Sequence, residues 1–337
     1  MKYIRIFRNS LLAASICAFI TGAAACESEK DLELPRQQYP ATEDKVGVLM
    51  NKIWQESSCF NLDADRKKLL NEMQEYADLC PNTYFKQYYS VTDPEELALM
   101  EGNTILGYHH RALEKVLEEM VSEKVPQGKI VMWQLYNMGY IVKTPDYCFG
   151  IDIKHKFAER FAPYIDFLCI THAHKDHYDS KIVDAMTQLG KHVYSNFLDN
   201  ADRFDGVTTI HPEGDIEIVT NVVDHDANTP AFVANYQIDC GASSGNKVIF
   251  HIGDSYNWQQ LKKSKSIDVF IPHLAVGLDM KKAINRLKPG CVLMSHVLEM
   301  EHPVNQWRWS YQYGFNEIDK LKMDNVYLPV WGEKMVF

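Results

Sequence analysis

Three histidines and one aspartate lie within six consecutive positions near the middle of the chain: His172, His174, Asp176 and His177. They directly follow the apolar run 165–170, which predicts a buried strand. His172 and His174 are two positions apart, so their side chains leave the same face at a strand end. Neutral imidazole nitrogens and carboxylate oxygens are the ligands that hold zinc and similar divalent ions. The spacing therefore predicts a metal site at the end of this strand.

One histidine near a strand end is more often a hydrogen-bonded structural residue than a metal ligand. Four such groups without a cation would crowd polar atoms and like charges at one point, which favours the metal site. Downstream, His225, Asp254 and His296 also follow apolar runs, at positions where loops expose side chains. These three residues are the candidates to complete the site. Other histidines compete with them, and His273 is the main rival of His296; the others are His211, His251 and His302.

Apolar residues recur with helical period at 46–54, 69–77 and 113–121, so the region 46–124 is predicted to be mostly helical. Further helices are expected at 156–164, 180–189 and 280–287. His109 and His110 are adjacent on the last of the N-terminal predicted helices, the one that contains 113–121. Adjacent helical side chains point about 100° apart, so this pair is expected to be structural or at the surface.

From residue 128 onward the pattern changes to strands. They are expected first in a meander and then in alternation with helices, which predicts a sheet sandwich covered by helices. The predicted strands are 129–135, 140–144, 147–153, 165–170, 192–194, 232–238, 247–252, 267–271 and 291–295.

These motifs resemble the metallo-β-lactamase fold superfamily. The stretch 172–177 matches its His-x-His-x-Asp-His signature, and Gly253-Asp254-Ser255 matches its later Gly-Asp strand end. His225 and His296 match its remaining single histidines. The resemblance covers roughly residues 128–337. It implies an α+β fold, a four-layer αββα sandwich, here with an added helical N-terminal segment at 46–127.

The resemblance also implies two divalent metal ions, most simply Zn²⁺, with Mn²⁺ or iron as alternatives. The first ion would be held by His172, His174 and His225, and the second by Asp176, His177 and His296. Asp254 would bridge the two ions, since a carboxylate has two oxygens. Asp176 is also the candidate catalytic residue that orients the nucleophile. Asp152 matches an acidic residue that supports the imidazoles from behind, although a turn role is nearly as good an interpretation.

Within the superfamily, a bridging acid favours a dinuclear hydrolase and disfavours antibiotic cleavage. The contexts of His273 and His296 look closest to the lactonase and phosphodiesterase branch. The implied reaction is hydrolysis of a lactone, carboxylic ester or phosphodiester by a metal-activated hydroxide. Two alternatives stay open: an iron-dependent oxidoreductase or dioxygenase on the same fold, and a non-catalytic anchored binding protein.

The N-terminus has the pattern of a secretory signal. Lys2, Arg5 and Arg8 precede the apolar stretch 11–25, which is too short for a stable membrane span. Small residues directly before Cys26 resemble the lipobox of bacterial lipoproteins, although an alanine stands at 23 where leucine is commonest. We expect a signal peptide at 1–25, a lipidated Cys26, a flexible tether at 26–45 and a place in the bacterial cell envelope. Ordinary secretory cleavage before Cys26 is the alternative.

The composition limits the classes of substrate and the kinds of metal site that can be expected. The formal net charge is −10 and no basic run compensates it, so a nucleic-acid substrate is excluded in favour of a small-molecule or lipid-like one. The chain has eight cysteines but no Cys-x-x-Cys pair, which argues against a thiolate zinc site. Disulfides are permitted outside the cytoplasm, and Cys59–Cys80 is the candidate bridge. The sequence leaves the oligomeric state open.

Overall fold

The computed structural model describes residues 44–304 and 306–337. The chain divides into two compact units, Met1–Tyr39 and Pro40–Phe337, and every described residue belongs to the second. The predicted signal peptide, Cys26 and nearly all of the predicted tether therefore lie outside the described residues.

Two seven-stranded mixed sheets form the centre of the second unit, with strand orders β14-β1-β2-β3-β4-β5-β6 and β13-β12-β11-β10-β9-β8-β7. The first sheet consists of β1 (Val131–Gln134), β2 (Tyr140–Lys143), β3 (Cys148–Ile151), β4 (Phe167–Cys169), β5 (His192–Ser195), β6 (Asp202–Arg203) and β14 (Lys334–Val336). The second consists of β7 (Thr208–Ile210), β8 (Glu217–Val223), β9 (Val233–Asp239), β10 (Val248–His251), β11 (Val269–Ile271), β12 (Cys291–Leu293) and β13 (Val326–Tyr327).

Helices precede and interrupt these strands. The N-terminal helices are α1 (Lys45–Gln55), α2 (Ala64–Asp78), α3 (Asn82–Ser90), α4 (Pro94–Glu101) and α5 (Thr104–Ser122). Those between and after the strands are α6 (Ser180–Gln188), α7 (Met280–Leu287) and α8 (Tyr311–Leu321), with 3₁₀ turns at Ala158–Phe161 and Ala242–Ser244. Within the described residues, none of the helices combines the length and the apolar character that crossing a membrane requires.

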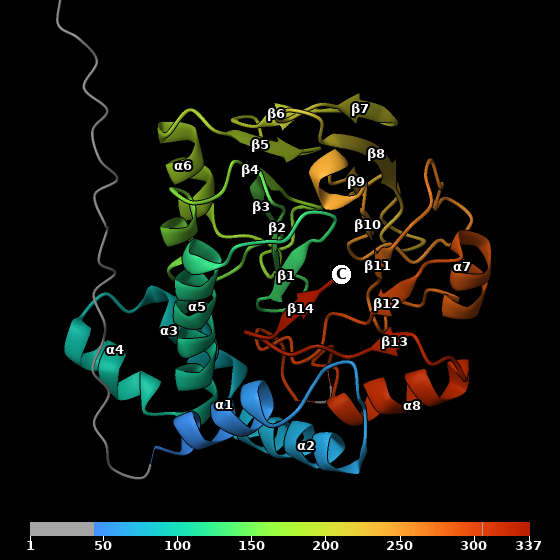
Figure 1. The fold of residues 1–337 in the computed structure, drawn as a ribbon. Helices are drawn as coiled ribbons and strands as arrows, with labels where there is room; N and C mark the ends of the chain where they lie inside the picture. The colour runs from blue at the N-terminus through green and yellow to red at the C-terminus, as the bar shows by residue number, and fades with distance from the viewer. Residues whose placement is uncertain (1–43, 305) are drawn as a thin grey trace, which may run out of the picture. The chain divides into compact units, whose positions relative to one another are not determined.

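Side-chain alternation along the strands builds the layers. In β1, Met132 lies in the apolar core between the two sheets, whereas Val131 and Trp133 lie in the core between the first sheet and the helices α5 and α6. A third core joins the second sheet to α7, α8 and the N-terminal helices. The order of layers is thus helix, sheet, sheet, helix (Figure 1). The predicted αββα sandwich is confirmed.

The N-terminal helices are tied to the C-terminal part of the chain by buried charges. Arg66 on α2 is 1% exposed and its guanidinium donates to both carboxylate oxygens of Glu333, each at 2.7 Å. Arg308 donates to the carbonyl oxygens of Ala77 and Cys80 at the end of α2. Removing one partner of such a pair would leave an uncompensated buried charge, so the helices are held firmly against the sandwich.

Two predictions from the sequence are wrong in detail. The helix expected at 156–164 is only the 3₁₀ turn Ala158–Phe161, because Pro163 lacks the N–H that a continuing helix requires. Cys59 and Cys80 are free thiols. Cys59 lies in the core between the sheets and Cys80 in the core under the N-terminal helices, so no bridge forms between them.

Candidate metal centre

The functional side chains gather at one edge of the sandwich, beyond the carboxyl ends of the strands. β3 and β4 are parallel neighbours, as are β10, β11 and β12, and β8 runs in the same direction as β10 because both are antiparallel to β9. The segments that follow these strands therefore emerge on the same side. They carry, in chain order, Asp152, the loop 171–177, His225, Asp254, His273 and His296.

All seven side chains that the sequence singled out as ligands lie together here. One group of potential ligand atoms belongs to His172, His174, His225 and Asp254, and a second belongs to Asp176, His177 and His296. Within each group the ligand atoms lie within 4.8 Å of one another. The two groups are those that the resemblance assigns to the first and second ions.

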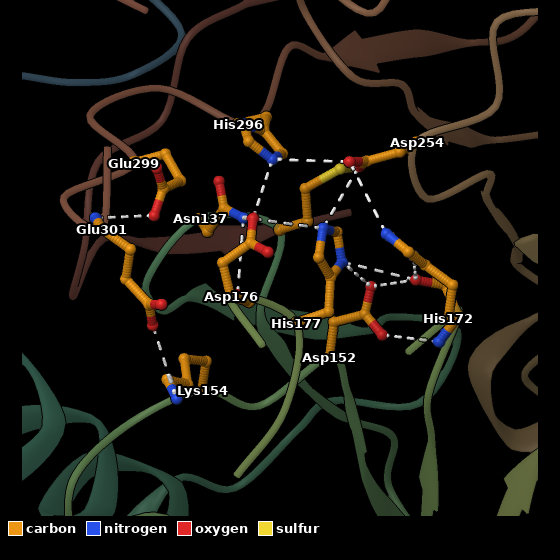
Figure 2. A network of polar contacts seen from close by, with 12 residues as sticks. Asn137, Asp152, Lys154, His172, Asp176, His177, Asp254, His296, Glu299 and Glu301 are labelled. Atoms are coloured by element: carbon orange, nitrogen blue, oxygen red, sulfur yellow. Dashed lines mark hydrogen bonds and ion pairs between the residues drawn. The ribbon is translucent and has the colours of Figure 1, made fainter. Parts of the chain in front are cut away.

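Asp254 faces side chains of both groups, among them His172, His177 and His296 (Figure 2). Its Oδ1 lies 3.2 Å from His177 Nε2. Its Oδ2 lies 3.7 Å from His172 Nε2 and 3.6 Å from the Nε2 atoms of both His225 and His296. One carboxylate thus faces imidazoles of both groups, which is the arrangement that a bridging ligand requires.

The hydrogen bonds at the back of the imidazoles decide which nitrogen faces the centre. His177 Nδ1 donates to Asp152 Oδ2 at 2.8 Å. Asp152 Oδ2 also accepts from Thr171 Oγ1, whose oxygen in turn accepts from His172 Nδ1 at 2.9 Å. His225 Nδ1 donates to Asp226 at 3.1 Å. Because Nδ1 carries the proton of the neutral ring in each of these three histidines, the neutral ring keeps its lone pair on Nε2.

Apart from the facing carboxylates of Asp254 and Asp176, those inward nitrogens meet no polar group in the described residues that could satisfy them. The Nε2 atoms of His172, His177 and His225, together with Asp254 Oδ1, are buried and make no hydrogen bond. Unpaired buried polar atoms are rare, since each costs about 1–3 kcal/mol. Lone pairs that converge beside the carboxylates of Asp176 and Asp254 fit divalent metal ions, and supporting carboxylates behind them are usual for metal-binding histidines.

The electrostatics of the centre point the same way. Burial lowers the pKa of His177, but Asp254, Asp176 and Asp152 outweigh it and raise that pKa well above the ordinary value. Burial raises the pKa of Asp254, but neighbouring histidines, His177 first, hold it well below the ordinary value. For His172, burial and the neighbouring His177 outweigh Asp254 and lower the pKa well below the ordinary value. The buried carboxylates are thus stabilised by positive charge close to them, which metal ions or protonated histidines can supply.

Several supporting residues escaped sequence analysis. Asn137, in the turn between β1 and β2, donates from Nδ2 to Asp176 Oδ2 at 2.8 Å, and its backbone adopts a left-handed φ of 57°. Asp176 Oδ2 also faces His296 Nε2 at 3.1 Å. Burial raises the pKa of Asp176, but His177 and the His296 hydrogen bond outweigh it and lower the pKa. Asparagine tolerates left-handed backbone in tight turns, so the Asn137-Met-Gly139 stretch was the available signal.

Asp152, which the sequence left between two roles, supports the centre. It is fully buried, and its Oδ1 accepts from the backbone N–H of Thr171 at 2.7 Å in addition to the bonds of Oδ2. Its carboxylate therefore fixes both the start of the loop 171–177 and the ring of His177. Thr171 and Asp226 are each adjacent to a predicted ligand in sequence, but nothing in the sequence shows that they bond to it.

The backbone before Asp254 has to lie very close to the loop 171–177 and to β9. Gly253 has a left-handed φ of 52°, and a Cβ there would lie 2.8 Å from both Thr171 Cβ and Val233 Cγ1. A larger residue would separate the end of β10 from the loop 171–177. Glycine is therefore required to bring Asp254 against His172.

Of the four competing histidines, His251 and His302 bond to other groups and His211 is exposed outside the centre. His251 Nε2 donates to the Met138 carbonyl oxygen, and His302 pairs with Glu299. His109 and His110 are buried on α5, where His109 bonds to Tyr89 and His110 pairs with Glu101 and Glu114. His273 does reach the centre: a ring nitrogen of His273 lies within 4.8 Å of ligand atoms of Asp254 and His296.

No protein-family model matches the chain, and no curated protein sequence matches it significantly. Among solved structures, it is similar to Igni18, described as a novel metallo hydrolase from Ignicoccus hospitalis, with a TM-score of 0.47, 16% identity, and coverage of 62% of this chain and 98% of that chain. It is also similar to the metallo-β-lactamase fold protein YhfI from Bacillus subtilis (TM-score 0.46, 13% identity, 63% and 100% covered). A third is CmlA, a diiron β-hydroxylase from Streptomyces venezuelae (TM-score 0.48, 12% identity, 64% and 55% covered). At these identities the likeness is one of fold alone.

Proposed function

We propose that this protein is a metal-dependent hydrolase that cleaves an ester-type bond in a lactone, a carboxylic ester or a phosphodiester. The observation that carries the proposal is the convergence of unpaired imidazole Nε2 atoms from two groups of side chains on either side of the Asp254 carboxylate. We propose two divalent ions. His172, His174 and His225 would hold the first, Asp176, His177 and His296 the second, and Asp254 both.

The donor set favours particular metals. It consists of imidazoles and carboxylates without a thiolate, which suits zinc, manganese or iron and disfavours soft copper(I) sites. When bound, such ions act as Lewis acids that lower the pKa of water and polarise the oxygen of an ester-type bond.

The chain's own residues supply position and proton handling. Asp176 is held by the Asn137 amide and lies beside His296, so its carboxylate is placed to orient an attacking water and to accept a proton from it. Asp152 fixes the ring of His177. The Phe232 ring lies 5.1 Å from the ring of His174 and 5.6 Å from that of His172, centroid to centroid, and forms an apolar flank beside them.

Metal analysis of the purified protein, followed by turnover assays, tests this proposal. We expect two zinc or manganese ions per chain and hydrolysis of a generic lactone or of bis(4-nitrophenyl) phosphate. His172→Ala should lose metal and activity, whereas His211→Ala, at an exposed histidine outside the centre, should keep both. Bound iron with oxygen consumption would instead support the oxidoreductase alternative, and no bound metal would support a binding protein.

We also propose that the chain is exported and anchored in the cell envelope by a lipid on Cys26, close to small-molecule or lipid-like substrates. The support is the sequence 11–26, which has an apolar run followed by small residues and the cysteine. Cys26→Ser should move the full-length protein from the membrane fraction to the soluble fraction. A mature chain that stays membrane-bound without Cys26 would contradict the lipid anchor.

A further inference from the structure

His273 lies at the centre but is oriented differently from the proposed ligands. It follows β11 and is 4% exposed. Ser295 donates its backbone N–H to the Pro272 oxygen at 3.1 Å, and Leu274 donates to the Ser295 oxygen at 2.9 Å, so the parallel pairing of β11 and β12 continues past both strands. His273 and His296 thus leave neighbouring strand ends, and their rings stack with centroids 3.9 Å apart and planes 22° apart.

The ring of His273 has a defined tautomer. Its Nδ1 accepts the backbone N–H of Ala275 at 2.8 Å. A backbone N–H can only donate, so this Nδ1 carries a lone pair and the neutral ring carries its proton on Nε2. This is the opposite of His172, His177 and His225, whose Nδ1 atoms face hydrogen-bond acceptors.

The tautomer separates two roles. A nitrogen that carries a proton cannot bind a cation, so the Nε2 of His273 is a poor metal ligand, although a ring nitrogen of His273 lies within 4.8 Å of ligand atoms of Asp254 and His296. It is instead a neutral hydrogen-bond donor. Across the described residues, 44–304 and 306–337, no hydrogen bond or ion pair joins His273 to Asp254, and no group accepts from its Nε2. Among these described residues the Nε2–H has no acceptor, which leaves this donor open to a bound molecule.

We propose that His273 is a catalytic residue that donates its Nε2–H to an oxygen of the substrate that gains or carries negative charge during hydrolysis. This rests on the proposed function and deepens it. A fixed neutral donor next to a metal pair stabilises such an oxygen without adding a charge that would repel the cations. The acceptor is the carbonyl oxygen of a lactone or ester, or a non-bridging oxygen of a phosphodiester.

Two substitutions distinguish donation from packing. His273→Phe keeps an aromatic ring to stack on His296 but removes the donor, whereas His273→Gln keeps an N–H but loses the stack. We expect both variants to retain two metal ions. The Phe variant should lose about 10²–10³-fold in kcat, and the Gln variant should lose about tenfold or less. A Phe variant with near wild-type kcat, or one that loses a metal ion, would overturn the proposal.

Nuclear magnetic resonance tests the tautomer without activity. In protein labelled with ¹⁵N-histidine and loaded with ¹¹³Cd, the ligand histidines should show nitrogen–cadmium coupling at Nε2. His273 should show none, together with a proton bonded to Nε2. Cadmium coupling at His273, or a proton on its Nδ1, would show that it is a ligand or has the other tautomer, and would refute the proposal.

Inorganic phosphate, as a probe of the anionic oxygen, separates this proposal from the hydrolase proposal. Titrated into metal-loaded protein, phosphate should shift the His273 Nε2–H resonance, and it should bind about tenfold more weakly to the Phe variant than to the wild type or the Gln variant. His211→Phe is the matched control and should leave binding unchanged. If this pattern holds but no ester is hydrolysed, the hydrolase proposal fails while the donor role of His273 stands. Equal phosphate binding by all variants would overturn the donor role.

Discussion

Asp152→Asn is the sharpest test of how the centre is supported. Asp152 is fully buried and accepts three hydrogen bonds, from the backbone N–H and the hydroxyl of Thr171 and from Nδ1 of His177. Its φ of 47° is left-handed, and asparagine adopts that backbone more readily than most residues. The substitution therefore changes the chemistry of one side chain while keeping its shape and backbone.

The magnitude follows from the three bonds. The amide is least costly with its oxygen at the Oδ2 position, where it still accepts from Thr171 and His177. Its NH₂ then opposes the buried N–H of Thr171, which loses its acceptor at a cost of about 1–3 kcal/mol. The neutral oxygen also makes His177 a weaker base. Loss of such a supporting group typically lowers metal affinity by about 10–100-fold. At about 1.4 kcal/mol per tenfold, that is about 1.4–2.8 kcal/mol.

Competition with a chromophoric chelator measures this affinity. Asp166→Asn is the matched control, because Asp166 accepts the backbone N–H of Cys148 at 2.8 Å at the opposite end of β3 and β4. We expect weaker binding of one of two zinc ions in Asp152→Asn and wild-type affinity in Asp166→Asn. Unchanged affinity in Asp152→Asn, or an equal loss in the control, would refute the reasoning.

Two further predictions concern backbone and pH. Gly253→Ala should destabilise the protein by more than about 2 kcal/mol in a denaturant titration and lower metal occupancy, since its Cβ would clash at 2.8 Å. Gly190→Ala is the control: it also has a left-handed φ, 67°, but open space around it, so it should cost about 1–2 kcal/mol and keep the metal. Equal effects of the two substitutions would contradict the requirement for glycine at 253. Burial lowers the pKa of His109 to about 3 and also lowers the pKa of His155. Below pH 6.5 the unfolded chain therefore binds more protons than the folded chain. The free energy of unfolding falls from pH 6.5 toward 3, by up to about 1.4 kcal/mol per pH unit for each group. His110 opposes this, because burial lowers its pKa but two glutamates outweigh it and raise that pKa, so its stabilisation is present below pH 6.5 and is lost as the pH rises through the folded value. His109→Phe should flatten the acid loss of stability, measured by denaturation from pH 7 to 4, and an unaltered slope would contradict the assignment.

Most candidate ligands of the metal centre could be predicted from local patterns in the sequence. The spacing of His172, His174, Asp176 and His177 is a short-range feature, and the loop that follows β4 presents these side chains together. Asp254 and His296 were found because polar residues that follow buried strands emerge at a sheet edge. The strands themselves were found because β-branched and apolar runs between turn residues have few alternatives.

Strand pairings between distant parts of the chain could not be predicted from the sequence. β14 pairs with β1, with Val131 opposite Val336, although the two strands lie far apart in the sequence. The residue pattern of either strand does not show which strand it pairs with. The helix α8 and the hairpin of β7 and β8 were not predicted from sequence. The cysteine spacing suggested a bridge because composition alone does not show that the two thiols lie in separate cores.

The supporting contacts of the centre depend on the same tertiary structure. Asn137 meets Asp176 only because the turn between β1 and β2 reaches the loop after β4. The difference between His273 and the ligand histidines lies in one backbone hydrogen bond from Ala275. A sequence gives residue types, but it does not give the tautomer that a neighbouring N–H selects.

Anomalous X-ray diffraction from crystals of the zinc-loaded protein, recorded on both sides of the zinc absorption edge, tests the central claim most directly. Two zinc peaks are predicted, one beside the Nε2 atoms of His172 and His225 and one beside those of His177 and His296, with the Asp254 carboxylate between them. Peaks elsewhere, or no zinc at this edge of the sandwich, would contradict the account.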